Sequence, residues 1–131
     1  MAGGTNLESL VTNVIDCGLR IHRHLGPGLL ESVYERLLAD GLEQQGILVV
    51  RQHPVDFCFE GKQFVDGFRA DLFVENQLVI EIKSVERLAP VHSRQLLTYL
   101  RLMEQPLGLL LNFGGATFKE GIKRVVNNYA P

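Results

Sequence analysis

The sequence has few cysteines, no long apolar run and little net charge. These features argue against a cysteine-based metal or redox protein, a membrane-spanning protein and a strongly basic nucleic-acid-binding protein, respectively. Among 131 residues the two cysteines, Cys17 and Cys58, show no Cys-x-x-Cys or Cys-His spacing. Each is expected to be a small buried thiol, with a metal or redox role as the less favoured alternative. No stretch reaches the length of a membrane span, and residues 1–6 lack the basic start and apolar run of a signal peptide. We therefore expect a cytoplasmic protein that does not bind membranes.

Charge is small overall but unevenly placed along the chain. The formal net charge of −2 at pH 7 argues against a protein that holds nucleic acid by bulk electrostatics. Residues 84–131 contain six basic and three acidic side chains, whereas residues 1–83 contain seven and twelve, so the two parts carry +3 and −5. An acidic site beside a basic flank suits a metal-dependent enzyme that acts on a phosphate backbone, although ordinary scatter of charge gives the same difference.

Length and composition predict a single domain over residues 1–131. Hydrophobic residues make up 46% of the chain and charged residues 21%, which is the balance of an ordinary globular protein. A chain of this length buries most of its apolar surface without disulfide bonds or metals. The sequence contains no internal repeat and no low-complexity tract.

The periodicity of apolar residues predicts an α/β fold with a mixed β-sheet flanked by α-helices. Steps of three and four residues indicate helices over about 6–24, 30–45 and 91–104, and alternation or continuous apolar runs indicate strands. The expected strands are a short one at 47–52, alternating residues at 55–59, then 64–74, 78–84, 107–113 and 122–127. Residues 60–62 form the turn of a β-hairpin, and Gly-Pro-Gly at 26–28 ends the first helix.

Three charged residues on two neighbouring strands carry the strongest chemical signal. Asp71 lies on one predicted strand, and Glu81 and Lys83 share one face of the next because strand side chains alternate. Two carboxylates brought together repel unless a cation neutralises them, and hard divalent cations such as Mg²⁺ prefer oxygen ligands. An exposed Glu-Lys pair is the ordinary alternative. Both flanking segments are expected to be buried, however, and buried charges usually serve a function.

Three blocks of sequence occur in a characteristic order over about residues 20–128. They are GLLESVY at 28–34, RAD at 69–71 with EIK at 81–83, and QLLTY at 95–99. This arrangement resembles the PD-(D/E)XK nuclease superfamily and, more narrowly, the small bacterial and archaeal proteins of the GxxExxY family. Ala70 stands where the superfamily usually has proline. The resemblance implies a restriction-endonuclease-like core.

The resemblance also implies roles for individual residues. Asp71 and Glu81 match the acids that bind Mg²⁺ or Mn²⁺, and the backbone carbonyl of Ile82 would be a further ligand. Lys83 matches the lysine that orients or activates the attacking water. Glu31 lies where lambda-exonuclease-like members place a helical acid at the metal.

Several of these residues have more than one interpretation. Glu31 is also explained as an exposed first-turn glutamate favoured by the helix dipole, and Glu35, one turn on, is the alternative acid. Gln95 and Tyr99 share a helix face, so they either bind substrate beside the metal, as in RecB-like nucleases, or pack. Tyr34 is grouped with them as a residue that binds substrate or supports the ligands.

His22, Arg23 and His24 precede the Gly-Pro turn, where they contact phosphate or form a solvated helix end.

The leading hypothesis is a metal-dependent nuclease that hydrolyses phosphodiester bonds of nucleic acid, most plausibly DNA. The first alternative is an inactive module with the nuclease fold that binds nucleic acid or a protein partner. The second is a structural subunit in which Lys83 forms a closed salt bridge with Glu81 or Asp71. A small core with little added surface for DNA also favours a homodimer or a protein partner.

Overall fold

The structure is a computed structural model that describes residues 6–129, and its centre is a five-stranded mixed sheet. Residues 1–5, for which we expect no signal peptide, and residues 130–131 lie outside the described part. The elements are α1 (Leu7–Leu25), α2 (Glu31–Glu43), β1 (Val49–Phe59), β2 (Lys62–Val74), β3 (Leu78–Lys83), α3 (Pro90–Met103), β4 (Leu107–Asn112), the short 3-10 helix η1 (Lys119–Gly121) and β5 (Ile122–Val126).

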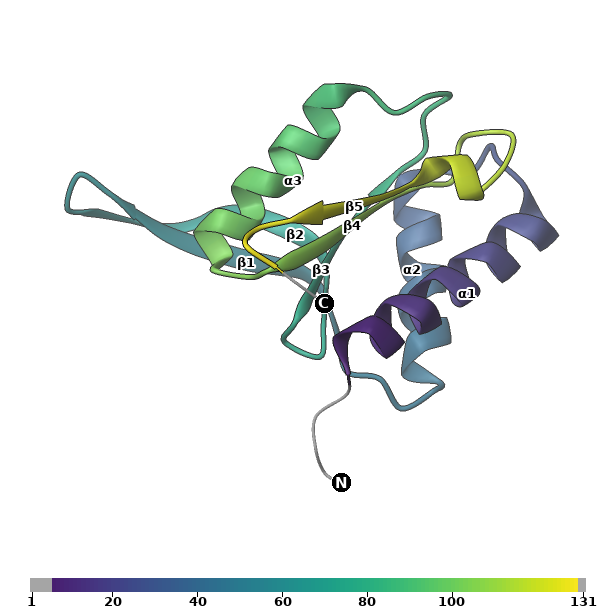
Figure 1. The fold of residues 1–131 in the computed structure, drawn as a ribbon, viewed down its shortest axis with the longest axis horizontal. Coiled ribbons are helices and arrows are strands. Elements are labelled where there is room, and N and C mark those ends of the chain that lie inside the picture. The colour runs from purple at the N-terminus through teal and green to yellow at the C-terminus, as the bar shows by residue number, and fades with distance from the viewer. Residues whose placement is uncertain (1–5, 130–131) are drawn as a thin grey trace.

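The sheet lies between helices on both faces, as Figure 1 shows. Its strand order is β1-β2-β3-β4-β5, with β3 and β4 parallel and the other neighbours antiparallel. Helices α1 and α2 cover one face and α3 covers the other (Figure 1). This arrangement confirms the predicted α/β class. Within residues 6–129 no helix is long and apolar enough to cross a membrane.

Local signals explain where the first helix begins and ends. The side chain of Asn6 accepts a hydrogen bond from the Ser9 backbone N–H (3.1 Å) and so caps the start of α1. At the other end Gly26 has φ +69°, a left-handed conformation that glycine adopts without strain, and its N–H donates to the His22 carbonyl (2.7 Å). The helix therefore stops where the Gly-Pro-Gly sequence predicts.

The first strand corrects one prediction. Residues 47–52 and 55–59 are not separate strands but belong to one strand, β1, which pairs with β2 through His53, Pro54 and Val55. Proline is tolerated there because β1 is an edge strand, so its missing N–H removes no partner from a neighbouring strand. The irregularity follows Val55, where the register with β2 shifts before it resumes at Phe57.

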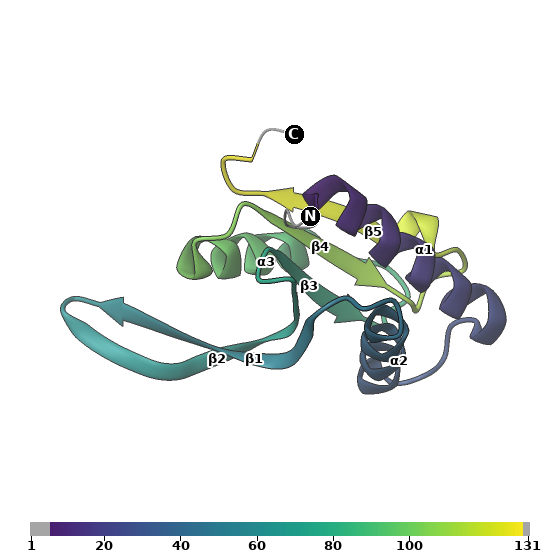
Figure 2. The ribbon, with the colours of Figure 1, turned by 90° about the horizontal axis from the view of Figure 1, so that it is seen from below.

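The β1–β2 hairpin extends beyond the rest of the sheet as an arm (Figure 2). Strand β2 pairs with β3 only through Leu72, Phe73 and Val74, so its earlier residues leave the sheet. Cys58 lies on this arm and is exposed, which makes its predicted burial wrong, whereas Cys17 of α1 is buried as predicted. The candidate site lies at this point, where β2 leaves β3.

Two apolar clusters hold the layers together. The larger joins α1 and α2 to one face of the sheet, and the smaller joins α3 to the other face through Leu96, Leu100 and Leu110. Every residue of β4 is buried, as its continuous apolar run predicts. The buried strand β4 and the packed helices therefore hold β3, and the polar residues at its carboxyl end, in a fixed position.

Candidate active site

Asp71 and Glu81 meet where β2 and β3 separate. The last ladder pair is Leu72 with Ile80, and in the continued register Asp71 lies opposite Glu81. There the Asp71 backbone N–H donates to Glu81 Oε2 (2.8 Å), and the Ile82 N–H donates to Asp71 Oδ2 (2.8 Å). Each carboxylate thus takes the place of a backbone carbonyl of the opposite strand, which satisfies the N–H groups that the divergence leaves unpaired. We call these two residues the crossed carboxylate pair.

Burial makes the negative charge of the pair unfavourable. Glu81 is 6% exposed, and burial, followed by the charge of Asp71, raises its pKa to about 8. Burial also raises the pKa of Asp71, partly offset by the hydrogen bond from Ile82. Two such groups titrate as a unit, so at neutral pH the pair retains a proton unless a cation takes its place.

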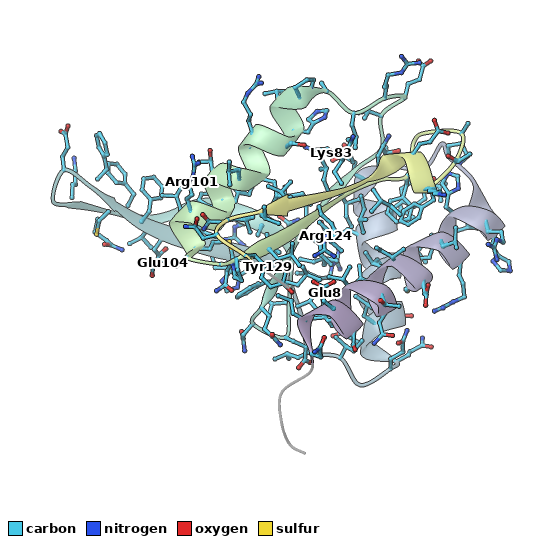
Figure 3. All side chains as sticks on the ribbon, in the orientation of Figure 1. Glu8, Lys83, Arg101, Glu104, Arg124 and Tyr129 are labelled. Atoms are coloured by element: carbon cyan, nitrogen blue, oxygen red, sulfur yellow. The ribbon has the colours of Figure 1, made fainter. Side chains whose placement is uncertain are left out.

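Lys83 follows Glu81 by two residues at the carboxyl end of β3 and is half-buried. Its charge lowers the pKa values of Asp71 and Glu81, which places the ammonium group within electrostatic reach of both. Figure 3 labels Lys83 between α3 and β5 in that view. The three ion pairs found among residues 6–129 do not include Lys83. The closed salt bridge of the structural alternative is therefore wrong for this geometry.

A second buried acid, Glu35 of α2, lies close to the crossed carboxylate pair. It is 5% exposed and forms an ion pair with Arg51 (3.0 Å). The Gln52 side-chain amide donates to Glu35 Oε1 (2.7 Å) and, at a longer distance, to Asp71 Oδ1 (3.4 Å). The charge of Glu35 raises the pKa values of both Asp71 and Glu81. Gln52 therefore links the helical acid to the pair, a role that its sequence context does not predict.

Glu31 occupies a different position from Glu35. It is the exposed first residue of α2, and its Oε2 accepts a hydrogen bond from the Ser84 backbone N–H (3.4 Å), directly after Lys83. The Ser84 hydroxyl donates to the Leu29 carbonyl (2.7 Å), so the loop before α2 is tied to the end of β3. Glu31 thus lies beside the strand end, and Glu35 lies on the Gln52 side of the pair.

The oxygen donors present fit a hard divalent cation. Asp71 and Glu81 supply carboxylates, and the Ile82 carbonyl belongs to the same strand segment. In the side-chain arrangement of residues 6–129, no three His, Cys, Asp or Glu side chains gather closely enough to hold one ion. Two carboxylates and a backbone carbonyl are oxygen ligands of the kind that Mg²⁺ and Mn²⁺ prefer.

The predicted aromatic and amide residues occupy distinct positions. The Tyr99 ring stacks on Phe68 (4.1 Å between centroids), and burial, followed by the charges of Glu81 and Asp71, raises its pKa. Tyr99 therefore lies in the field of the crossed carboxylate pair. Gln95, one turn earlier on α3, is exposed. A role of Gln95 and Tyr99 in binding substrate stays a prediction.

Tyr34 is fully buried and fixes the loop before α2. Its ring stacks on Phe113 (4.5 Å between centroids), its hydroxyl donates to the Gly26 carbonyl (2.5 Å), and the Leu29 N–H donates to it (3.2 Å). This burial leaves no ring surface for a substrate in the present conformation. We therefore keep the other predicted role, in which Tyr34 fixes the loop 26–30 and so supports Glu31.

His22 is neither solvated nor open to phosphate. It is 8% exposed, and its Nε2 lies 3.0 Å from the Gly115 carbonyl oxygen. Arg23 and His24 are exposed at the end of α1.

Comparison with known proteins gives one family. A family model described as the PD-(D/E)XK nuclease superfamily matches residues 8–125. A search of curated proteins finds no match. Among solved structures, the crystal structure of SSO0001 is 20% identical with a TM-score of 0.44, and the alignment covers 92% of this chain and 67% of that chain. The matched segment includes every candidate residue from Glu31 to Tyr99.

Proposed function

Because the chain belongs to the PD-(D/E)XK nuclease superfamily, we propose that it is a divalent-metal-dependent nuclease whose site is the crossed carboxylate pair. The observation that carries the proposal is the pairing of Asp71 and Glu81 at the divergence of two strands, with Lys83 two residues further on. A buried acid and a half-buried acid held this close are electrostatically costly, and a bound cation relieves that cost. The hydrogen bonds to the Asp71 and Ile82 N–H groups hold the pair in place, and an amide side chain would accept such bonds without the cost of a second carboxylate.

Asp71, Glu81 and the Ile82 carbonyl would hold Mg²⁺ or Mn²⁺, with Glu31 or Glu35 as the helical acid. Such an ion supplies Lewis-acid stabilisation of the scissile phosphate and lowers the pKa of a bound water. Glu35 would release its contacts with Arg51 and Gln52 to reach it, whereas Glu31 would give up only a long hydrogen bond to the Ser84 N–H. The smaller loss favours Glu31.

Lys83 would orient the attacking water and help remove its proton. Its ammonium group takes part in no ion pair within the described residues 6–129, so no carboxylate has to release it before it acts. Its strand end is rigid, because the Lys83 carbonyl accepts the Phe113 N–H (2.9 Å). A fixed strand end holds the Lys83 backbone in place beside the crossed carboxylate pair, so the side chain has only its own rotamers to adjust.

We assign DNA as the substrate and place the chain within the GxxExxY family. Gly28, Glu31 and Tyr34 supply that family's motif, and the loop contacts of Tyr34 give the motif a structural purpose. A homodimer or a protein partner would add DNA-binding surface to a chain whose net charge is −2.

Cleavage assays on matched substrates test the proposal. Purified protein is incubated with linear duplex, circular duplex and single-stranded DNA and with RNA, in Mg²⁺, Mn²⁺ or EDTA. We expect metal-dependent cleavage of DNA and a loss of at least about a hundredfold in Asp71→Asn and Lys83→Ala. Glu43→Gln, at an exposed position at the end of α2, is the matched control.

Two outcomes would contradict the proposed nuclease. Binding without cleavage in either metal would support the inactive module instead. Equal cleavage by wild type and by Asp71→Asn would assign the activity to a contaminating enzyme.

A further inference from the structure

The arm formed by β1 and β2 presents aromatic rings to solvent. Phe59 is 61% exposed and Phe64 is 38% exposed. Phe57 and Phe64 are register partners, as are Phe59 and Lys62, so these side chains lie on one face of the arm. Large exposed rings on a projecting hairpin point to a binding surface rather than to a core.

These rings continue toward the candidate active site. Phe64 stacks on Phe57 (5.3 Å between centroids), Phe57 lies 6.5 Å from Phe68, and Phe68 stacks on Tyr99 (4.1 Å). With the neighbouring Phe59 they form what we call the aromatic row, comprising Phe57, Phe59, Phe64, Phe68 and Tyr99. Tyr99 lies in the field of the crossed carboxylate pair. The row therefore runs from the outer end of the arm to the site.

Backbone packing fixes part of the row in place. A Cβ atom at Gly67 would lie 2.4 Å from Phe57 Cε1, so the Phe57 ring rests directly on the backbone of β2. Phe57 and Phe68 are half-buried, and Phe57 stacks on the more exposed Phe64. Rigid rings lose little entropy when a planar ligand stacks on them.

Charge on the arm disfavours duplex nucleic acid as its ligand. Residues 56–69 contain three acidic side chains and two basic ones, and one of the basic ones, Arg69, is paired with Asp66 (2.8 Å). Duplexes present phosphates outward and keep their bases stacked inside, so they need basic surfaces. Single strands expose base faces that stack on aromatic rings. The remaining cation, Lys62, lies over the Phe64 ring (5.9 Å), beside the place where a base would stack.

We propose that the aromatic row binds single-stranded nucleic acid by base stacking and leads it to the crossed carboxylate pair. The substrate of the site is then a single strand or a duplex with a single-stranded end. This inference rests on the proposed function for the cleavage step, but the binding step stands independently of it. Since the arm offers few cations to neutralise phosphates, the affinity should fall less steeply with salt than it does for a protein that contacts many phosphates.

A fluorescent reporter tests contact at the row directly. The chain contains no tryptophan, so Phe59→Trp introduces a single indole at the most exposed ring without disturbing the stacked pairs. The probes are a single-stranded oligothymidylate and a blunt duplex of equal length, added in EDTA. We expect the single strand to quench the indole and the duplex to leave it unchanged. Val126→Trp, half exposed on the opposite edge strand, is the matched reporter that should not respond.

Removal of the rings tests their contribution to affinity. Phe59→Leu with Phe64→Leu keeps the apolar surface but loses two rings, and binding of the oligothymidylate should weaken by at least roughly tenfold. Phe64→Tyr, which keeps a ring, and Val65→Ala, at a 73% exposed aliphatic position on the same arm, should bind as wild type does. A double-leucine variant that folds and binds as tightly as wild type would overturn the proposal.

Other outcomes separate this inference from the proposed nuclease. Stacking-dependent binding with no cleavage in any metal would sustain the aromatic row and defeat the nuclease. Cleavage that is equally fast for wild type and the double-leucine variant on single strands would sustain the nuclease and overturn the row. Self-association that the leucine variants abolish, with binding of single strands unchanged, would show that the row covers a second copy and would also overturn the proposal.

Discussion

Replacement of Glu81 by glutamine should make the metal-free protein more stable at neutral pH. Glutamine keeps an oxygen that accepts the Asp71 N–H and resembles the protonated carboxyl, but it cannot ionise. In the folded protein the pKa of Glu81 is raised from 4.5 to about 8 by burial and by the charge of Asp71. A folded state with the higher pKa holds a proton that the unfolded chain releases. The stability that Glu81 contributes is therefore full below about pH 4.5 and is lost as pH rises toward 8.

The size of the effect follows from that difference in pKa. Each unit corresponds to about 1.4 kcal/mol, so ionisation of the unfolded chain costs the wild type about 3 kcal/mol of unfolding free energy between pH 4 and pH 7. The cost continues to grow up to about pH 8. Glu81→Gln lacks this loss, so the difference between mutant and wild type should widen with pH in the same range.

Urea unfolding at several pH values in EDTA measures this difference. At pH 4 the two proteins should unfold at similar urea concentrations, and at pH 7 the mutant should be the more stable. The exposed Glu43→Gln serves as the control for the loss of a carboxylate elsewhere on the surface. A mutant that is no more stable relative to wild type at pH 7 than at pH 4 would refute the account of the buried pair.

Four further changes give separate tests. Millimolar Mg²⁺ or Mn²⁺ should raise the melting temperature of wild type and not of Asp71→Asn in differential scanning fluorimetry, because the ion binds only the folded pair. Lys83→Ala should lose cleavage in a gel assay but lower the free energy of unfolding by less than about 1 kcal/mol, because Lys83 forms no ion pair among residues 6–129. Loss of one partner of a buried salt bridge would instead cost about 3–5 kcal/mol. Tyr34→Phe should lower stability by about 1–2 kcal/mol in urea, because two backbone groups of the loop before α2 lose their partner. Asn112→Ala should cost about 2–4 kcal/mol in the same assay, because its buried side chain makes three hydrogen bonds to the loops after β3 and β4.

The helices and most strands could be predicted because their signals are local. The apolar steps of α1 and the Gly-Pro-Gly stop set that helix within one residue at either end. The alternation of β3 predicted Glu81 and Lys83 on one face, and the register of β2 with β3 brings Asp71 opposite Glu81. Both features follow from the two-residue alternation of side chains along a strand and from the order of the strands in the sequence.

Other features depend on long-range geometry. Gln52 reaches Glu35 and Asp71 from a left-handed backbone conformation (φ +51°) inside β1, and glutamine at that position gives no sequence signal for it. The exposure of Cys58 follows from the departure of the arm from the sheet, which depends on how few residues of β2 pair with β3. His22 is buried because a loop a long way along the chain, at Gly115, lies against it.

Anomalous diffraction from crystals grown with Mn²⁺ shows whether the crossed carboxylate pair binds a metal ion. We expect a manganese peak within about 2.5 Å of a carboxylate oxygen from both Asp71 and Glu81, and no such peak in Asp71→Asn crystals prepared in the same way. Wild-type crystals that bind manganese elsewhere but leave this pair without a peak, or Asp71→Asn crystals with an undiminished peak, would show that the pair is not a metal site.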